Sequence, residues 1–572
     1  MKKYLSLIAI MALMVTYAMA QAPVYTGVPD VKLYAGKSLS GAFDLEVYNT
    51  SDAATIYSVV TGTDVATISA GAPGTINYYG LTEASNNWRN VAFQATNEGG
   101  DGIATQVVKY STYLVKKLGR AVLGATDSET IDISAAVNAF GTPSYPGVAT
   151  WPASFDDGGA TSVVADAGVT AAIDTAAQTL TISNTSALSG KKLVRIEAAP
   201  ATAPNATDYD KGILQVFPNL ATNGKFDSSL SGWTTQLYAD GTEPIPTPTV
   251  ATSFAGKTNV YKANLTIGKK IKSTQVVYGT TPNTWYTARA KVATDATNVS
   301  GSKLKTYLYV LDDPLGGLPR SAHDVGANGM MDGPNVWNQM EISFYSRATV
   351  VALQIVSISP ATATASGDLY WDDVEFFQAP PAVEDSDLTY GYTKVAVNNG
   401  TFDSNTAGWW PQVYADGTDI GTIAWAGSVN GKSGVYSISQ TVGQKAKITQ
   451  ASGVAEAPLA EELVGGKSFK FSAFVCTSAA AGQAGKYYAY VYSYNTSYGI
   501  RRSAASIIQP GTLTQNTWEE IKVGGVLFTD IAGIQVVAIC PTNKSAQIHY
   551  IDDVTVAQDK DPIYFWDSAL TP

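Results

Sequence analysis

Two segments of the sequence place tyrosines on one face of a predicted β-strand. In 305–311 and 486–492, tyrosines alternate with aliphatic or small residues. Successive side chains of a strand point to opposite faces, so we expect the aliphatic face to enter the core and the tyrosine face to stay open. Tyrosine rings can cover the apolar face of a sugar, and amides can bond its hydroxyls. The predicted ligand-binding residues are Tyr307, Tyr309, Gln354, Tyr488, Tyr490, Tyr492 and Gln535.

The tyrosine face does not by itself prove a sugar site. Tyrosine has a high propensity for half-exposed strands, and the same rings could pack against another protein or a second copy of this chain. The pattern therefore predicts an open aromatic sheet, and leaves three roles for it: glycan binding, protein contact, or no ligand.

Acidic residues lie near both ends of two repeated segments. "NGKFD" and "NGTFD" begin the segments, and "DDV" occurs near the end of each. If the first and last strands lie side by side, these carboxylates converge, and a hard cation such as Ca²⁺ would neutralise them. The alternative is that they accept hydrogen bonds within turns. The candidate calcium ligands are Asp227, Asp372, Asp373, Asp403, Asp552 and Asp553.

The two cysteines, Cys476 and Cys540, both fall in the second repeated segment. Alignment of the two segments places them opposite Val292 and Ser359, so the first segment has neither. Both cysteines end predicted strands, and an exported location permits oxidation. We therefore predict a disulfide between them, with two buried, reduced thiols as the alternative.

Composition excludes some classes of function. The chain has 572 residues, a formal net charge of −11 and only 15% charged residues, which argues against nucleic acid or an anionic membrane as a partner. A histidine-containing triad or metal centre would have to use one of only two histidines, His323 and His549. Catalysis by a carboxylate pair is not excluded by such counts.

The N-terminal residues predict export. Lys2 and Lys3 precede an apolar run, and Ala18-Met19-Ala20 is typical of a cleavage site, so we read 1–20 as a signal peptide. A retained N-terminal anchor is the alternative. No later stretch approaches the ~20 apolar residues of a transmembrane helix. We therefore expect an extracellular or cell-surface protein without a transmembrane segment after signal removal.

The remaining chain reads as strands separated by turns, which predicts an all-β fold. Segments 90–110 and 193–217 share a weak strand–turn–strand pattern, which indicates two units of about 95 residues, a usual size for a β-sandwich. The second half is a clear duplication. "YADGT", a central Asn-x-Trp and a final Tyr-x-Asp-Asp-Val occur in the same order in both copies.

The frame "NGxFD…GW", "NxW" and "YxDDV" resembles the family 4/9/22 carbohydrate-binding modules. That resemblance implies two tandem β-jelly rolls that bind polysaccharide, and structural calcium is often found in this family. The first half resembles immunoglobulin-like and cadherin-like spacer domains in pattern alone. The resulting division is a signal peptide (1–20), two Ig-like β-sandwiches (21–117, 118–216), a jelly roll (217–378), a solvated linker (379–394), a second jelly roll (395–558) and a tail (559–572).

Two functions fit this organisation. The first is a secreted or cell-surface, non-catalytic adhesion protein that binds a polysaccharide or cell-surface glycan. The second is a structural surface protein, such as a subunit of an S-layer, fibre or matrix, whose jelly rolls mediate self-assembly. An enzyme is not expected, because the four units leave no segment for a catalytic domain of ~250 residues, and the tyrosine-bearing strands lack the carboxylate pair of a glycosidase.

Overall fold

The structure is a computed structural model of the full chain. It describes residues 21–25, 31–34, 38–51, 56–61, 66–68, 75–79, 88–111, 115–133, 161–174, 177, 179–198, 210–227, 229–316, 321–328, 333–384, 392–395, 397–495, 499–528 and 531–559. The predicted signal peptide (1–20) and all but the first residue of the predicted tail (559–572) lie outside these residues. The all-β prediction is confirmed. Among the described residues, helix is limited to α3 (Val299–Ser302) and three 3₁₀ turns, η1 (Leu45–Tyr48), η2 (Pro314–Gly316) and η3 (Ala382–Glu384).

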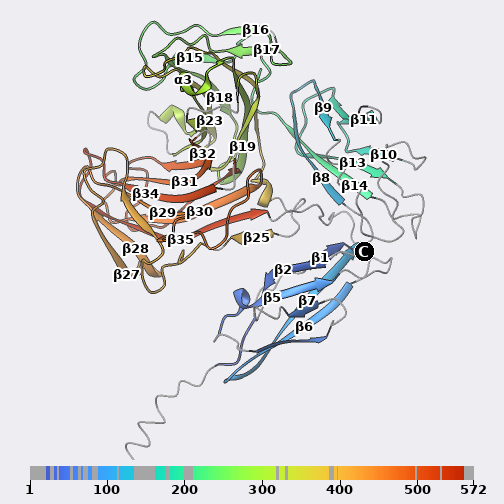
Figure 1. The fold of residues 1–572 in the computed structure, drawn as a ribbon, viewed down its shortest axis with the longest axis vertical. Coiled ribbons are helices and arrows are strands. Elements are labelled where there is room, and N and C mark those ends of the chain that lie inside the picture. Colours follow the sequence, from blue (N-terminus) through green and yellow to red (C-terminus); the bar gives the residue numbers. More distant parts are fainter. Residues whose placement is uncertain are drawn as a thin grey trace, which may run out of the picture.

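The N-terminal unit is a sandwich of a four-stranded and a three-stranded sheet (Figure 1). The long hairpin β6–β7 coincides with the strand–turn–strand pattern of the sequence, whereas β1 joins β7 in parallel. The larger sheet has the order β1 (Val31–Tyr34), β7 (Gly100–Ser111), β6 (Trp88–Asn97), β3 (Ile56–Thr61). The smaller has the order β2 (Ser38–Asp44), β5 (Thr75–Tyr79), β4 (Ala66–Ile68).

The second unit repeats this arrangement of four strands over three. Its core is a separate apolar cluster that includes Leu180, Ile182, Val194 and Ile196, all buried. The larger sheet has the order β10 (Thr161–Ala165), β13 (Lys192–Ala198), β14 (Asp210–Pro218), β8 (Val115–Leu123). The smaller has the order β11 (Thr170–Asp174), β12 (Thr179–Asn184), β9 (Asp127–Asp132).

Each of the two C-terminal repeats contributes five strands to each of two sheets. The first repeat supplies β15 (Thr234–Leu237), β18 (Lys270–Tyr278), β23 (Val350–Ile358), β20 (Lys305–Asp312) and β21 (Ser321–Asn328) to one sheet. It supplies β16 (Thr249–Phe254), β17 (Lys257–Lys262), β24 (Leu369–Phe377), β19 (Thr284–Thr294) and β22 (Asn338–Ser346) to the other.

The second repeat has the same strand order. Its strands in the first sheet are β32 (Gly499–Ile508), β31 (Lys486–Asn495), β34 (Ile531–Ile539), β29 (Lys445–Ala451) and β26 (Trp410–Val413). Those in the second are β33 (Glu519–Val526), β30 (Ser468–Thr477), β35 (Gln547–Asp559), β28 (Lys432–Gln440) and β27 (Thr422–Val429). A short strand, β25 (Tyr392–Val395), adds to β35.

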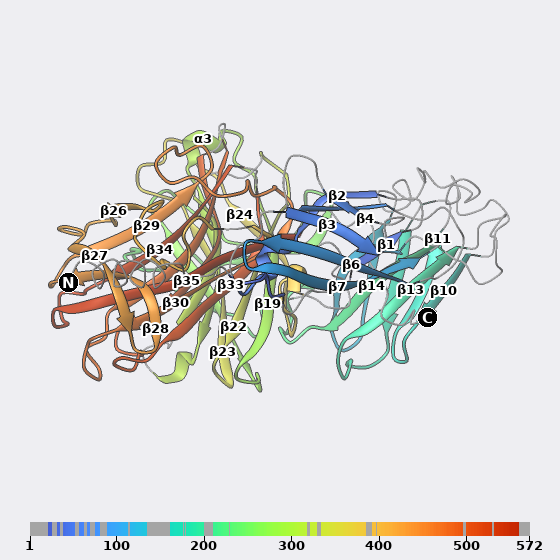
Figure 2. The ribbon, with the colours of Figure 1, turned by 90° about the horizontal axis from the view of Figure 1, so that it is seen from below.

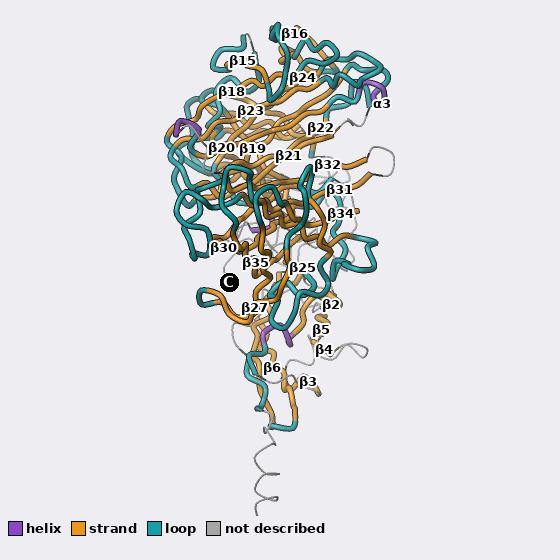
Figure 3. Tube along the Cα trace, turned by 90° about the vertical axis from the view of Figure 1, so that its left-hand side faces the viewer, coloured by secondary structure: helices purple, strands orange, loops and turns teal. Residues whose placement is uncertain are grey.

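The two repeats are joined edge to edge, which the sequence did not predict. β21 pairs with β32 and β22 with β33, so the sheets run through both repeats as one ten-stranded and one eleven-stranded sheet (Figures 2 and 3). The offset that relates Tyr309 to Tyr490 also relates Asp324 to Ala505, and these last two residues pair with each other. The junction therefore has an approximate two-fold axis that passes between Asp324 and Ala505.

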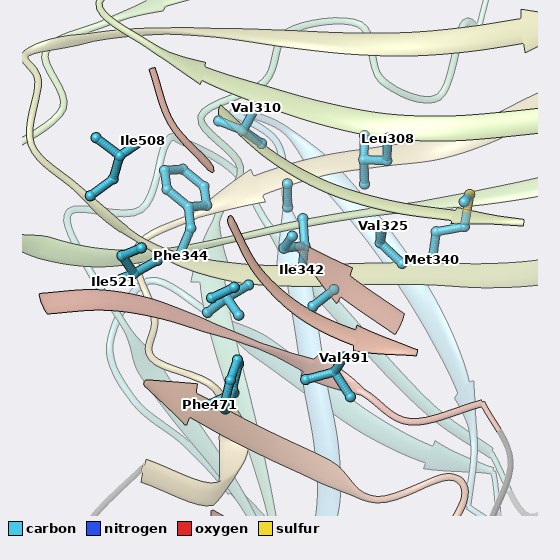
Figure 4. Packing of buried hydrophobic residues seen from close by; sticks show 14 of the residues in the cluster. Leu308, Val310, Val325, Met340, Ile342, Phe344, Phe471, Val491, Ile508 and Ile521 are labelled. Atoms are coloured by element: carbon cyan, nitrogen blue, oxygen red, sulfur yellow. The ribbon is translucent and has the colours of Figure 1, made fainter. Parts of the chain in front are cut away.

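One hydrophobic core fills the space between the two long sheets. The same buried cluster contains Leu308 and Ile342 from the first repeat and Phe471 and Val491 from the second, and Figure 4 shows these side chains gathered across the junction. The Arg347 side chain also forms an ion pair with Glu519 across the repeats. The repeats therefore form one packed body.

The second sandwich docks on the first repeat through a buried arginine. The Arg289 guanidinium forms an ion pair with Glu375 and donates a hydrogen bond of 2.9 Å to the Arg120 carbonyl oxygen. In turn the Arg120 side chain donates to the Pro380 carbonyl at 2.7 Å. Lys225 pairs with Asp127 of the sandwich at 2.6 Å. Polar contacts thus hold this sandwich against the outer face of the eleven-stranded sheet, over β19 and β24.

The predicted solvated linker is wrong in its first part. Ala379 and Val383 are almost fully buried, and Glu384 forms an ion pair with Lys470 of the second repeat. Residues 392–395 form β25 on the edge of β35 rather than a free connection. Ala379 packs with Phe377, and the Val383 amide donates to the Ser468 hydroxyl of the second repeat, so this part of the chain is fixed instead of acting as a hinge.

The phrase "NGxFD…GW" builds a loop at the start of each repeat. A Cβ on Gly224 would lie 1.9 Å from the Val374 carbonyl oxygen, so only glycine fits there, and Gly400 meets Val554 in the same way. Trp233 is buried and its indole N–H donates to the Asn223 carbonyl at 3.3 Å. These contacts are structural, and they hold the tryptophan in the core.

Candidate functional site

The outer face of the ten-stranded sheet carries one continuous row of side chains that crosses both repeats. Paired residues of neighbouring strands point to the same side of a sheet. Neighbouring strands lie about 4.8 Å apart, so a row across ten strands is roughly 43 Å long. The row consists of Thr234, Thr274, Gln354, Tyr309, Asp324, Ala505, Tyr490, Gln535, Thr449 and Trp410.

The predicted faces of the tyrosine strands are confirmed. Leu308, Val310 and Val491 are fully buried in the shared core, whereas Tyr307 and Tyr309 are half-buried on the outer face. In the second repeat the outer face is more covered, and Tyr490 is 1% exposed. The reason is a second apolar cluster on this face, formed by Tyr488, Tyr490, Ala505, Ile507, Val537 and Ile539.

A groove of about 380 Å³ lies over the centre of this row, at the junction of the repeats. Its volume falls within the usual range of ligand sites. Both repeats line it, so the two tyrosine faces form a single site instead of two separate ones. The lining residues are Tyr238, Tyr309, Leu311, Asp324, Gln354, Tyr414, Lys486, Tyr488, Tyr490, Ile507 and Gln509.

Equivalent tyrosine pairs border the groove on its two sides. The hydroxyls of Tyr238 and Tyr309 lie 3.0 Å apart, and those of Tyr414 and Tyr490 lie 2.9 Å apart. Tyr238 and Tyr414 are the tyrosines of the two "YADGT" segments, each of which follows a short edge strand. We did not predict them as site residues, although the repeated Tyr before a turn was a signal that could have identified both.

Amide side chains lie beside the tyrosines. Gln354 pairs across strands with Tyr309, and Gln535 with Tyr490. Both amides are more than nine-tenths buried, and neither has a hydrogen-bond partner among the described residues. Next in the row, the hydroxyls of Thr274 and Thr449 are also buried without a partner in the described part of the chain. A polar ligand on this face could satisfy the two amides.

The predicted ligand-binding residues divide into two groups. Tyr309, Gln354, Tyr488 and Tyr490 line the groove. Tyr307, Tyr492 and Gln535 lie on the same face outside the lining, within the same run of tyrosines or the same row. Leu311 and Lys486, which the alternation also placed on this face, belong to the lining. Asp324, Ile507 and Gln509 were not predicted.

The predicted calcium ligands of the "DDV" segments have lysine partners. Lys257 contacts Asp372 at 2.7 Å and Asp373 at 2.6 Å, and Lys432 pairs with Asp552 and Asp553 in the second repeat. Burial raises the pKa of Asp372 and of Asp552 to about 6, with the neighbouring aspartate as a further cause in each pair. The lysine ammonium is a competing partner for any cation here.

The aspartates at the start of the repeats are exposed. Asp227 lies at the surface, and Asp403 accepts a hydrogen bond of 2.8 Å from the Thr401 hydroxyl. Among the described residues, no group of three or more His, Cys, Asp or Glu side chains is placed to hold a metal ion. Calcium at these residues therefore stays a prediction.

The predicted disulfide is absent. Cys476 and Cys540 are both buried, free thiols. Cys476 lies on β30 of the eleven-stranded sheet, whereas Cys540 follows β34 of the ten-stranded sheet, so their strands are not neighbours. The alignment was also one residue out, because Val475, not Cys476, occupies the core position of Val292, and Cys476 corresponds to Ala293.

No family model matches the chain, and no curated protein matches it in sequence. Among solved structures, the tandem CBM22-1–CBM22-2 domain of Xyn10C from Paenibacillus barcinonensis is 13% identical, with a TM-score of 0.22, and the match covers 60% of this chain and 98% of that one. TmCBM61 in complex with β-1,4-galactotriose is 18% identical, with a TM-score of 0.21, and the match covers 28% of this chain and 99% of that one.

An enzyme domain also matches. The enzymatically active domain of tailspike protein 4 from bacteriophage CBA120 is 16% identical, with a TM-score of 0.22, and the match covers 28% of this chain and 21% of that domain. This chain therefore spans only about a fifth of the tailspike domain. At such low TM-scores these are distant likenesses, and the fold described above rests on the strand pairing of the chain itself. In the described residues, no helix is both long and apolar enough to span a membrane.

Proposed function

We propose that this chain is a secreted or cell-surface protein that binds a glycan without catalysis, and that the groove shared by its two repeats is the binding site. The observation that carries the proposal is the groove itself: tyrosines from both repeats and the unpartnered Gln354 amide converge on one space of about 380 Å³. Rings that cover the C–H face of a sugar, beside amides that bond hydroxyls, suit a pyranose chain.

The polar residues of the groove support binding over hydrolysis. Glycoside hydrolysis generally uses two carboxyl groups that flank the scissile bond. Asp324 is the single carboxylate among the described residues that line this groove. One carboxylate can accept hydrogen bonds from sugar hydroxyls, but it cannot by itself supply both an acid and a base.

Export and calcium complete the proposal. Residues 1–20 act as the signal peptide, so mass spectrometry of the exported protein should find Gln21 at the N-terminus, and peptides from 1–20 would refute this.

Calcium binds the predicted aspartates of the native repeats. A chelator should then lower Tm and excess calcium should restore it, because a ligand of the native state alone stabilises it. An unchanged Tm would refute the calcium site and leave the lysine pairs as the role of the "DDV" aspartates.

Retention on insoluble polysaccharides tests the groove. Tyr309→Ala removes a half-buried ring and should abolish retention on any polysaccharide that the native protein binds. Tyr490 is almost fully buried, so Tyr490→Phe, which keeps the ring and removes the hydroxyl bonded to Tyr414, is the better change in the second repeat. Tyr345→Ala, on the other sheet, is the matched control. Equal retention of Tyr309→Ala and Tyr345→Ala would refute the site.

The shared groove also predicts the stoichiometry. Two separate modules would bind two short oligosaccharides per chain and gain avidity from their linkage. A single groove at the junction should bind one. Isothermal titration with an oligosaccharide of the retained polysaccharide measures this number, and a value of two per chain would refute the shared site.

Self-association is the second candidate function, and the outer edge of the second repeat favours it. Trp410 and Trp425 are 43% and 44% exposed on β26 and β27, the terminal strands of the two long sheets. Exposed aromatic side chains on open edge strands are typical of association surfaces. Sedimentation velocity over a range of protein concentrations, with Trp425→Ser beside the native chain, tests it. A monomer at every concentration would exclude this function.

A further inference from the structure

The outer face of the ten-stranded sheet is rich in lysine, although the chain as a whole carries a net charge of −11. Cross-strand pairing places these lysines on the same side as the row through Tyr309 and Tyr490. Asp324 is the one acidic side chain that the described strands add to this face. The lysines are Lys270, Lys272 and Lys305 from the first repeat, and Lys445, Lys447 and Lys486 from the second.

Only two of these lysines have an acidic partner among the described residues. Lys270 contacts Asp240, and Lys445 contacts Asp416, each at 2.5 Å, and both aspartates belong to the exposed "YADGT" turns. The other four form no ion pair with any described residue. The ammonium of Lys486 instead lies 5.0 Å from the centroid of the Tyr488 ring.

Two of the four unpaired lysines are held in an environment that disfavours their charge. Burial lowers the pKa of Lys447, and burial followed by the charge of nearby Lys445 lowers the pKa of Lys486. A partly desolvated cation without a counter-charge is unfavourable until an anion approaches it. The groove is therefore incomplete electrostatically, and Lys486 forms part of its lining.

We propose that the glycan bound in this groove is an acidic polysaccharide, one whose sugar units carry carboxylate groups. The inference rests on the proposed function, since it names the ligand class of the same site. Tyrosine rings and the Gln354 amide bind the neutral parts of the sugar units. The carboxylates bind the unpaired lysines, while Asp324 at the two-fold axis accepts a hydroxyl and excludes an acidic group from the centre.

The test compares acidic polysaccharides with their own neutral forms. Polygalacturonate, alginate and hyaluronan are each offered beside the same polymer after carboxyl reduction, in affinity electrophoresis and titration calorimetry with the full chain. At least one acidic form should bind about tenfold or more tightly than its reduced form. Salt should weaken the acidic complex selectively, because the screening length falls from about 10 Å at 0.1 M to about 3 Å at 1 M.

Lysine variants test whether the unpaired lysines cause the tighter binding of the acidic form. Lys447→Gln and Lys486→Gln should each weaken the acidic complex about tenfold or more, as expected for the loss of a charge-assisted contact. In both variants the acidic polymer should lose more affinity than its reduced form does. Lys191→Gln, an exposed lysine of the second sandwich, removes the same charge away from the groove and should have no effect.

The outcomes separate the two proposals. If a reduced, neutral form binds as tightly as its acidic form and Tyr309→Ala abolishes this, glycan binding stands and the acidic class is refuted. If no polysaccharide of either kind is retained, the proposed function is refuted as well. If a single-stranded oligonucleotide binds the native chain more tightly than all three acidic polymers, the lysines serve nucleic acid, and the acidic glycan is again refuted.

Discussion

On the outer face of the eleven-stranded sheet, Arg289 and Glu375 of the first repeat form a buried ion pair, whereas Ser472 and Thr555 share a hydroxyl contact of 2.9 Å at the same place in the second repeat. The first pair lies under the second sandwich, and Arg289 reaches its backbone. The strand frame and the core are common to both repeats. The difference shows that the outer face of the first repeat is fitted to the sandwich that covers it.

Removal of one partner of the charged pair should have the largest effect on stability. Arg289→Ser leaves Glu375 buried without its cation, and broken buried pairs typically cost about 3–5 kcal/mol. The double change Arg289→Ser with Glu375→Thr imports the pair of the second repeat and should recover most of that loss. Chemical denaturation of the single and double variants measures both values.

The same double variant should loosen the second sandwich without unfolding it. Its own core is separate, so limited proteolysis of the connection after β14, between 219 and 225, should quicken while the sandwich persists as a fragment. If the double variant is as unstable as Arg289→Ser alone, the first repeat needs the ion pair for its own stability. The residue pair of the second repeat then cannot replace it, although the two repeats have the same strand order.

A buried histidine gives the next largest difference. His549 occupies the position of Leu369, and burial lowers its pKa to about 3, with neither ring nitrogen bonded to a described residue. Because the folded state resists protonation, the unfolded state binds more protons below pH 6.5, and stability falls as the pH drops from about 6.5 towards 3. His549→Leu should remove this component and raise Tm at pH 7.

Thermal melts between pH 3 and pH 8 measure how the stability of the native chain and of His549→Leu depends on pH. The opposite substitution can be made at the equivalent position of the first repeat. Leu369→His should add a second component of the same sign in the same pH window. Glu375 and Asp372 act in the opposite direction, because their raised pKa values, about 7 and about 6, favour the folded state as the pH falls. Parallel pH profiles for the native chain and His549→Leu would contradict the assigned role of the imidazole.

A smaller difference lies at the two ends of the outer row. Trp410 ends the row in the second repeat and Thr234 ends it in the first. An exposed indole can stack on one further sugar unit, so Trp410→Thr should weaken glycan binding about threefold to tenfold and leave Tm within about 1 °C. Thr234→Trp should extend the site in the other direction. No change in either variant would limit the site to the central groove.

The smallest expected effect concerns the thiols. Cys476→Ala restores the residue type of the first repeat, Ala293, at a buried position, and removes a thiol that accepts a weak hydrogen bond of 3.4 Å from Asn430. Stability should change by less than about 1 kcal/mol. Thiol labelling of the unfolded, unreduced native chain should find two free cysteines, and a chain with none would restore the disulfide.

Local patterns predicted the faces of the strands correctly. Alternation along 305–311 separated Leu308 from Tyr309 because the pleat imposes a period of two. For the same reason, an alignment error of one residue assigns every side chain of a strand to the wrong face. That is why an alignment one residue out placed Cys476 in the core position that Val475 occupies.

Long-range pairing could not be read from the sequence. The edges of β21 and β32 carry no motif that marks each other as partners, and the shared groove exists only because they pair. Tyr238 and Tyr414 were missed for a related reason. Each lies just beyond the short strand that carries the row, and its side chain reaches a tyrosine of another strand, which alternation along one strand does not reveal.

The pairing of Asp324 with Ala505 at the two-fold axis has a consequence for how such a site can change. Two identical subunits meeting here would place the same residue on both sides of the axis, giving either two aspartates in repulsion or no carboxylate at all. Covalent linkage of the repeats removes that restriction, because each copy mutates independently. The chain can therefore hold a single carboxyl group at its centre of symmetry, a composition that no symmetric dimer of either repeat could reach.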